Sequence, residues 1–338
     1  MEREIRERIA VIGGGSWGTA FASMLGERYA DVALWVREPD VCDGIRRDRE
    51  NRVFLPGVAV PAAVRPTVDI GEALADRGIV ALAVPSQHLR AVALRAAPHL
   101  SPGARVVSLA KGLENGSLQR MTEVLGEALP GFAGLLAVLS GPTFAREVAA
   151  GKPAGATVAA KDFRVAASLQ AAFSGRRFRV YAETDVAGIE LGGALKNVMA
   201  IAAGMSDGLG FGHNARALLI ARGLAEIARV GARLGANPQT FSGLSGLGDL
   251  VLTCTGDLSR NRTFGMRVGR GEKAADILAG MKMVAEGVET ARAAADLSRR
   301  LEVPMPITEQ VCRILHEGKD AMAAVSELFA RAPRPERD

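Results

Sequence analysis

The sequence is poor in the residues that usually build redox and metal sites. Its 338 residues include four scattered histidines and three cysteines, which are Cys42, Cys254 and Cys312. These cysteines lie far apart and lack the close spacing of metal ligands, so we expect no metal site. An odd and sparse set of cysteines is typical of reduced thiols in a cytosol, which predicts a cytoplasmic protein.

Long apolar runs and long basic runs are also missing. No uncharged apolar stretch reaches the roughly 18–20 residues of a membrane helix. The charged first eight residues lead into a predicted strand rather than a signal peptide. Lys and Arg (42) exceed Asp and Glu (37) without forming a basic run, so we expect neither membrane insertion nor a nucleic-acid partner. The net charge of +5 suits an anionic cofactor and substrate.

Aromatic residues make up only 4% of the chain, but hydrophobic residues make up 48%, which is enough for a substantial core. The first half alternates short apolar runs with helical patterns, which predicts a doubly wound α/β sheet. The expected strands are 8–12, 31–36, 78–84, 104–109, 134–139, 155–160 and 177–181, and helices between them include 86–96 and 117–128.

This alternation ends near residue 183, after which the patterns are helical. Helices are expected at 185–205, 215–234, 282–301 and 308–317. The fold class predicted is therefore an N-terminal doubly wound (Rossmann) sheet followed by an all-α C-terminal domain. The expected boundaries are 1–183 for the dinucleotide-binding domain and 184–330 for the helical domain, with a frayed tail at 331–338.

A glycine-rich turn lies between the first predicted strand and the following helix. Glycines at 13, 15 and 18 form the G-x-G-x-x-G pattern of dinucleotide-binding proteins, in the strand–turn–helix context that this pattern requires. Gly13 would make the tight turn, Gly15 would admit the pyrophosphate, and Gly18 would let helix and strand pack closely. The alternative is a glycine turn without a ligand.

The choice between NADP and NAD stays open. An acidic residue at the end of the second strand would bind the ribose hydroxyls of NAD, whereas a basic residue would bind the 2′-phosphate of NADP. Arg37 and Glu38 are adjacent there, so either cofactor is possible. Arg37 could equally be a solvated loop charge.

Lys196 interrupts an apolar helical pattern. Between Glu190 and Asp207 it is the only charged residue, and Gly, Ala, Leu and Met surround it. Burial lowers the pKa of an ammonium group, so such a lysine can exchange protons near neutral pH. The alternative is a lysine that snorkels out of a packed helix.

A candidate phosphate site follows in the helical half. Ser259 is a predicted N-cap, and Arg260 and Asn261 lie in the first helical turn, where unpaired N–H groups favour an anion. Simple helix capping is the alternative. Asp249, which follows glycines, could bind a substrate hydroxyl or stabilise a turn.

Two further segments lie at the carboxyl ends of predicted strands, where open sheets bind ligands. Lys111 follows one strand, and Gly141 to Thr143 follow another. Either segment could also be a structural turn.

Together these motifs resemble the bacterial NAD(P)-dependent glycerol-3-phosphate dehydrogenases. The similarity runs in family order along nearly the whole chain. The matching segments are Gly-Gly-Gly-Ser-Trp-Gly-Thr-Ala at 13–20, Leu-Pro-Gly at 55–57, Ala-Lys-Gly-Leu-Glu at 110–114, Ser-Gly-Pro-Thr-Phe-Ala at 140–145, Gly-Ala-Leu-Lys-Asn-Val at 193–198, Ala-Ala-Gly-Met-Ser-Asp-Gly-Leu-Gly at 202–210, Leu-Thr-Cys-Thr at 252–255, Ser-Arg-Asn-Arg at 259–262 and Val-Ala-Glu-Gly-Val-Glu-Thr at 284–290. Phe54 departs from the family, where a tyrosine is common.

The resemblance implies roles for individual residues. Lys196 would be the proton donor and acceptor. Cofactor contacts would come from Ser16, Trp17, Arg37, Lys111, Ala145, Arg260, Val284 and Glu286, besides the three glycines. Substrate contacts would come from Lys111, Gly141, Thr143, Lys196, Asp249, Ser259, Arg260 and Asn261.

The function expected from this resemblance is interconversion of dihydroxyacetone phosphate and sn-glycerol 3-phosphate with NADP or NAD, which would supply phospholipid synthesis. One alternative is a 3-hydroxy acid dehydrogenase of the same architecture, which would not need a phosphate site at 259–261. Another is a non-catalytic dinucleotide sensor, which would have no reason to keep Lys196. A homodimer is suggested only by analogy with other helical second domains.

Overall fold

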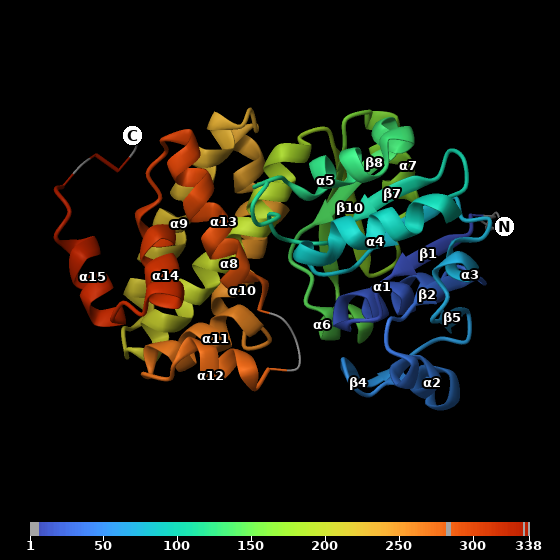
Figure 1. Cartoon of the computed structure of the whole chain (residues 1–338), viewed down its shortest axis with the longest axis horizontal. Coiled ribbons are helices and arrows are strands. Elements are labelled where there is room, and N and C mark those ends of the chain that lie inside the picture. Colours follow the sequence, from blue (N-terminus) through green and yellow to red (C-terminus); the bar gives the residue numbers. More distant parts are fainter. Residues whose placement is uncertain (1–6, 282–284, 334, 337–338) are drawn as a thin grey trace.

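The computed structural model describes residues 7–281, 285–333 and 335–336. An α/β part is followed by a helical part that packs beside it (Figure 1). The α/β part holds an eight-stranded sheet with the strand order β10-β9-β8-β7-β6-β1-β2-β5. The strands are β1 (Ile9–Ile12), β2 (Val32–Trp35), β5 (Val64–Thr67), β6 (Ile79–Leu82), β7 (Arg105–Ser108), β8 (Leu136–Ser140), β9 (Ala154–Ala160) and β10 (Phe178–Glu183).

Both faces of this sheet are covered by helices. Ile9 and Val11 of β1 join a core cluster with α1 (Ser16–Gly26) and α7 (Phe163–Phe173). Ala10 and Ile12, which point to the other face, join a cluster that contains α3 (Ile70–Leu74), α4 (Leu89–Ala96) and α5 (Met121–Ala128). This alternation confirms the predicted doubly wound sheet, whose strands are buried on both sides.

The sheet departs from the sequence expectation in two places. β8 and β9 pair antiparallel, while the other neighbouring strands pair parallel. The chain between β8 and β9 holds only the short helix α6 (Ala145–Ala149), so it returns directly instead of crossing over the sheet.

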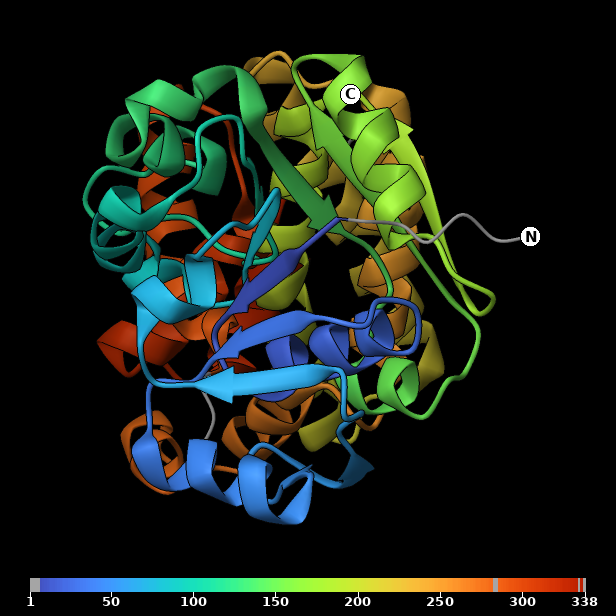
Figure 2. The ribbon, with the colours of Figure 1, turned by 90° about the vertical axis from the view of Figure 1, so that its right-hand side faces the viewer.

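Three strands were not predicted: the edge strand β5, and the hairpin of β3 (Glu50–Asn51) and β4 (Leu55–Ala59). β5 and β4 each contain a proline, and neither shows a continuous apolar run. β1, β2 and β5 lie side by side as the dark-to-light blue arrows of Figure 2, and α2 (Pro39–Asp48) lies below them.

The helical part contains no strand among the residues described after Glu183. Its helices are α8 (Val186–Gly208), α9 (His213–Arg233), α10 (Asp249–Thr255), α11 (Arg260–Gly269), α12 (Ala274–Ala279), α13 (Glu286–Leu301), α14 (Pro306–Glu317) and α15 (Ala321–Phe329). α10, α12 and α15 are short and were not predicted. The expected helix at 282–301 begins at Glu286, and residues 282–284 lie outside the described residues.

Helix α8 forms the centre of the helical part. It is long and apolar enough to cross a membrane, but 94% of its apolar window is buried within the protein, which marks it as a core helix. Its glycines admit neighbouring backbone: a Cβ on Gly192 would lie 2.5 Å from the Ser245 carbonyl oxygen, and one on Gly204 would collide with the Arg262 carbonyl. Close protein packing therefore explains these two glycines.

Candidate active site

The glycine turn connects β1 to α1 at the carboxyl edge of the sheet. Gly13 has a φ of +123°, and a Cβ there would lie 2.6 Å from the Ala83 carbonyl oxygen. A Cβ on Gly18 would collide with the Gly13 carbonyl, whereas a Cβ on Gly15 would meet nothing within 4 Å. Gly13 and Gly18 are therefore required by the fold, while Gly15 faces open space beside the N–H groups that begin α1. An open position beside a helix N-terminus is the arrangement that a dinucleotide pyrophosphate needs.

Two side chains of the first turn of α1 flank this space. Ser16 Oγ donates a hydrogen bond to the Phe54 carbonyl oxygen (2.5 Å), so this contact uses the backbone and does not need a tyrosine hydroxyl. Trp17 packs against Phe21, with ring centroids 5.5 Å apart. The buried Nε1–H of Trp17 has no hydrogen-bond partner among the described residues. An orphaned indole N–H at this turn fits a site that a ligand completes.

Arg37 lies just beyond the carboxyl end of β2. Its side chain is 71% exposed, and its Nε lies 2.8 Å from Glu38 Oε1. The two residues thus form a solvent-exposed ion pair, which is weak. A 2′-phosphate could replace Glu38 as the partner of Arg37, and a ribose hydroxyl could bind Glu38, so both cofactors remain compatible with this edge.

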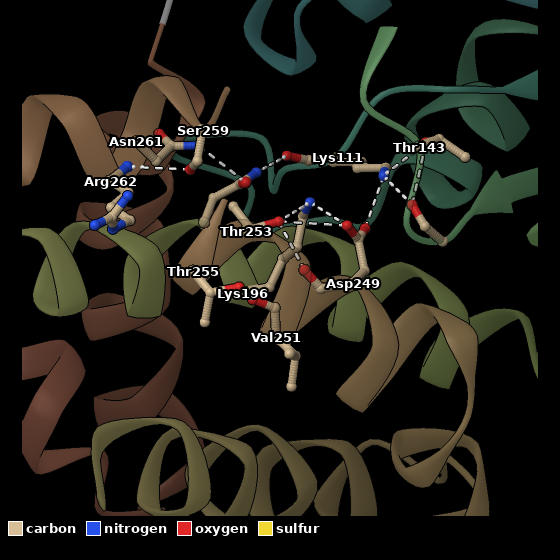
Figure 3. A network of polar contacts seen from close by, with 12 residues as sticks. Lys111, Thr143, Lys196, Asp249, Val251, Thr253, Thr255, Ser259, Asn261 and Arg262 are labelled. Carbon is tan, nitrogen blue, oxygen red and sulfur yellow. Dashed lines mark hydrogen bonds and ion pairs between the residues drawn. The ribbon is translucent and has the colours of Figure 1, made fainter. Parts of the chain in front are cut away.

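A cluster of two lysines around one carboxylate lies between the two parts of the molecule (Figure 3). Lys196 Nζ of α8 donates to Asp249 Oδ1 at 2.6 Å and to Thr253 Oγ1 at 2.7 Å. Lys111 Nζ, beyond β7, donates to Asp249 Oδ2 at 2.7 Å. Lys196 is 6% exposed and Asp249 is 1% exposed. Lys196 is therefore buried and paired, and it does not snorkel.

The electrostatics of this cluster tune Lys196. Burial lowers the pKa of its ammonium to about 8, and the nearby Lys111 charge acts in the same direction, while Asp249 opposes both. A lysine with a pKa near 8 holds its proton at neutral pH and can still release it. Two of its three N–H donors bond to Asp249 and Thr253, and the third has no partner among the described residues, so it can serve a substrate oxygen.

Local structure explains why Asp249 and Thr253 meet the same lysine. A single turn of π-helix (Leu244–Gly248) directly precedes Asp249, which is the first residue of α10. Asp249 and Thr253 are four residues apart, so both face the same side of that helix. Asp249 thus belongs to a helix N-terminus that follows the glycine-rich segment, and both of its oxygens accept from lysines.

The loop that follows β8 completes the surroundings of Lys111. Lys111 Nζ donates to the Gly141 carbonyl at 2.8 Å and lies 3.5 Å from Thr143 Oγ1. Gly141 has a φ of +144°, and a Cβ there would lie 2.9 Å from the Ala156 Cα. Ala145 is the first residue of α6. The two predicted loop segments are thus joined through Lys111.

The candidate phosphate turn begins α11 as expected. Ser259 caps the helix, because its Oγ accepts from the Arg262 N–H at 3.2 Å. Arg260 is exposed, and its side chain forms no hydrogen bond or ion pair with another described residue. Asn261 is 9% exposed and donates to Asn197 Oδ1 at 3.0 Å. Within this turn, Arg260 is the group most open to a ligand.

Glu286 lies at the start of α13 and faces the sheet. Its Oε1 accepts from the Ser86 N–H, beyond β6, at 3.2 Å. Burial raises the pKa of this carboxyl, and the Ser86 hydrogen bond and the Arg260 charge oppose that rise. Val284, the neighbouring predicted cofactor contact, lies outside the described residues.

Sequence reasoning missed Thr253 and Ser86 as site groups, and it used Asn197 only as the polar residue that follows Lys196 in the motif at 193–198. Thr253 lies four residues after Asp249, so a helix predicted at 249–255 would have placed it beside Lys196. Ser86 contributes only its backbone N–H, which no sequence pattern could reveal.

Within the described residues, no cluster of three or more His, Cys, Asp or Glu could hold a metal ion.

A glycine turn that is open at Gly15, together with a buried lysine of lowered pKa in the helical part, is typical of the class of nicotinamide-dependent dehydrogenases with a helical second part. The comparisons with known proteins agree. Residues 8–166 match the family model of the NAD-dependent glycerol-3-phosphate dehydrogenase N-terminus, and residues 185–326 match that of its C-terminus. The chain belongs to the NAD-dependent glycerol-3-phosphate dehydrogenase family.

Relatives match over nearly the full length. A protein of Geobacter metallireducens named glycerol-3-phosphate dehydrogenase (NAD(P)+) is 51% identical over 98% of this chain and 99% of its own length. The counterpart from Geobacter sulfurreducens is 52% identical over the same shares. The crystal structure of glycerol-3-phosphate dehydrogenase from Coxiella burnetii has a TM-score of 0.92 and 38% identity, covering 96% of this chain and 99% of that one.

Proposed function

We propose that this chain interconverts dihydroxyacetone phosphate and sn-glycerol 3-phosphate with NADP or NAD. The observation that carries the proposal is the buried Lys196–Asp249–Lys111 cluster, which supplies a proton donor. Full-length similarity to proteins named for this activity supports the choice of substrate.

Lys196 would act at the carbonyl oxygen of the substrate. A bound nicotinamide supplies the hydride that reduces the ketone carbon. The free N–H of Lys196 donates a hydrogen bond to the oxygen and then transfers its proton as negative charge develops there. Asp249 and Thr253 hold the ammonium in one orientation, so the proton donor is in place before the substrate arrives.

Lys111 and the turn at 259–261 would bind the rest of the substrate. Lys111 is 15% exposed, so its charge can reach a ligand while Asp249 holds its position. Arg260 supplies an unshared positive charge at the N-terminus of α11, a location that favours phosphate. Gly141 and Thr143 contact Lys111, and Asn261 follows Arg260 in the turn.

The two alternative functions have less support. D-mandelate dehydrogenase, solved with NADH, shares the fold with a TM-score of 0.62 at 13% identity, so the fold alone does not select a substrate. The exposed Arg260 favours a substrate that carries a phosphate over a 3-hydroxy acid that carries none. A non-catalytic sensor would not need a buried lysine whose pKa is lowered to about 8.

We further propose that the chain acts in the cytoplasm, that glycerol 3-phosphate made there supplies phospholipid synthesis, and that the working division lies between residues 183 and 184. β10 ends at Glu183 and α8 begins at Val186, which supports this division. A homodimer is proposed by analogy only, and sedimentation of the purified chain would test it.

Absorbance at 340 nm tests the proposed reaction directly. Purified protein should oxidise NADPH or NADH when dihydroxyacetone phosphate is added, and much more slowly with unphosphorylated dihydroxyacetone. Oxidation with a 3-oxo acid, without oxidation by dihydroxyacetone phosphate, would favour the other dehydrogenase class. Cofactor binding without turnover of either substrate would favour a sensor.

A further inference from the structure

Three hydrogen bonds connect the backbone of Lys111 to the start of α13. Asn197 Nδ2 donates to the Lys111 carbonyl oxygen at 3.1 Å. Asn261 Nδ2 donates to Asn197 Oδ1 at 3.0 Å, and the Gly287 N–H donates to Asn261 Oδ1 at 3.0 Å. In Figure 3 the dashed lines between Asn261 and Lys111 trace the first part of this amide relay.

Backbone groups at both ends fix the direction of the amide relay. The Gly287 N–H can only donate, so it must face the oxygen of the Asn261 side chain. The nitrogen of Asn261 then faces the oxygen of Asn197, which turns the nitrogen of Asn197 toward the Lys111 carbonyl. Asn197 and Asn261 are 4% and 9% exposed, so reversal of either amide would leave buried groups unpaired.

The α13 end of the relay is held against both parts of the molecule. A Cβ on Gly287 would lie 2.6 Å from the Asn197 carbonyl oxygen, so the start of α13 packs closely on α8. The preceding residue, Glu286, accepts from the Ser86 N–H beyond β6. In the same turn, Glu289 Oε2 accepts from Asn115 Nδ2 at 2.6 Å. The start of α13 therefore fastens the helical part to the carboxyl edge of the sheet.

We propose that Asn261 is a positioning residue that couples the cofactor side of the site to Lys111 on the substrate side. Its oxygen orders the N-terminus of α13, where Glu286 lies, and its nitrogen orients Asn197, which holds the Lys111 backbone. This proposal rests on the proposed function, because it assigns Glu286 to the cofactor and Lys111 to the substrate. It deepens that function by giving Asn261 a role other than simple substrate contact.

NADPH binding without substrate distinguishes the two roles. A residue that only touched the substrate would leave the Kd of NADPH unchanged when replaced. The loss of the Gly287 bond in Asn261→Ala should instead raise that Kd about tenfold, as expected for about 1.4 kcal/mol. Quenching of protein fluorescence by NADPH would measure it, and an unchanged Kd in a folded variant would overturn the proposal.

The variant Asn261→Asp separates the two ends of the relay and keeps the side-chain size. A carboxylate still accepts from the Gly287 N–H, so the Kd of NADPH should stay within about threefold of the wild-type value. It cannot donate to Asn197, so Asn197 turns its nitrogen away from the Lys111 carbonyl. The KM for dihydroxyacetone phosphate should then rise about tenfold. A rise in NADPH Kd equal to that of Asn261→Ala, with no change in this KM, would contradict the proposed relay.

A matched control lies two residues further along α11. Thr263 is exposed, and Thr263→Ala should leave both constants unchanged. Thermal unfolding of all three variants separates a local effect from a failure to fold.

Coupling itself is measured with NADPH and glycerol 3-phosphate, two reduced compounds that cannot react with each other. Saturating glycerol 3-phosphate should change the NADPH Kd of the wild type. The ratio of the NADPH Kd with glycerol 3-phosphate to the Kd without it should lie closer to one in Asn261→Ala. If the wild-type ratio differs from one and Asn261→Ala has the same ratio, the proposed coupling through Asn261 is wrong. If glycerol 3-phosphate leaves the NADPH Kd of the wild type unchanged, the two sides are not coupled and the proposal is wrong. Turnover of dihydroxyacetone phosphate at 340 nm then tests the proposed substrate separately.

Discussion

At the glycine turn the groups assigned to the cofactor are open, whereas at the lysine cluster the charged groups are buried and paired. Gly15 faces open space, and the Arg37 side chain is 71% exposed. Lys196 and Asp249, by contrast, are 6% and 1% exposed and lie 2.6 Å apart. The glycine turn takes its shape from backbone that tolerates no Cβ at Gly13 or Gly18. The lysine cluster is held together by ion pairs between its lysines and Asp249.

This difference predicts different consequences of mutation. Changes at the open positions, Gly15 and Arg37, should act on cofactor affinity, because a ligand supplies the partners that these positions lack. Changes at the lysine cluster should act on turnover, because its hydrogen bonds exist before any ligand binds. A variant that mixes the two effects would weaken the comparison.

Replacement of Lys196 should give the largest effect. Lys196→Met removes the proton donor but keeps an apolar side chain of similar length, and Asp249 retains Lys111 as its partner. We expect kcat to fall by at least about 10²-fold, the usual contribution of a general acid, while NADPH binding persists. Steady-state kinetics and fluorescence titration would measure the two quantities. A near-normal kcat would remove Lys196 from the mechanism.

Arg260 should contribute to substrate binding through the phosphate. Arg260→Ala should raise the KM for dihydroxyacetone phosphate roughly 10- to 150-fold, as expected for a charge-assisted contact of about 1.5–3 kcal/mol. Dihydroxyacetone should be affected little, so the ratio of kcat/KM between these substrates is decisive. Arg267→Ala on the same helix removes an arginine that pairs with Glu272 and serves as the control. A wild-type ratio in Arg260→Ala would make Lys111 the better phosphate ligand.

Two glycines of the same turn should behave differently. Gly18→Ala introduces a collision with the Gly13 carbonyl and should destabilise the fold by about 1–3 kcal/mol. Gly15→Ala meets open space, so stability should be unchanged while the Kd of NADPH rises about tenfold. Thermal unfolding and NADPH titration of both variants test this. Equal losses of stability would show that Gly15 is also required by the fold.

The lowered pKa of Lys196 predicts opposite pH profiles for the two directions. Ketone reduction needs the ammonium form, so kcat should fall as pH rises through about 8, and alcohol oxidation needs the neutral amine, so kcat should rise over the same range. Asp249 raises this pKa, so Asp249→Asn should move both profiles to lower pH. Profiles that fall together above pH 8 would assign the titration to another group.

The sequence predicted the parts of the fold that have a strong local pattern. Buried strands such as β1 and β6 are short apolar runs, and α8 is a long apolar helix, so their positions agree closely with expectation. β5 and α10 were missed because β5 contains Arg65 and Pro66 and α10 has only seven residues. For such short elements, tertiary packing decides the structure.

The candidate site was predictable to a similar degree. The sequence and its family resemblance singled out Lys196, Asp249 and Lys111, but their pairing depends on residues up to 138 positions apart in the chain. Asn261 was assigned to the substrate, while its two protein contacts reach Asn197 and Gly287, which lie in other helices. Contacts between distant segments carry no local sequence signal, so the amide relay becomes visible only in the structure.

An effect confined to cofactor choice is expected at the open end of the site. Arg37→Asp places a second carboxylate beside Glu38, which repels a 2′-phosphate and offers acceptors to ribose hydroxyls. The ratio of kcat/KM for NADPH to that for NADH should fall about tenfold, equivalent to about 1.4 kcal/mol, with kcat for NADH unchanged. Arg47 is the matched control for Arg37, because it is 72% exposed and pairs with the adjacent Asp48, as Arg37 pairs with Glu38. Arg47→Asp removes the same charge from α2 and should leave the ratio unaltered. If both variants shift the ratio equally, the effect is one of net charge, and Arg37 does not contact the 2′-phosphate.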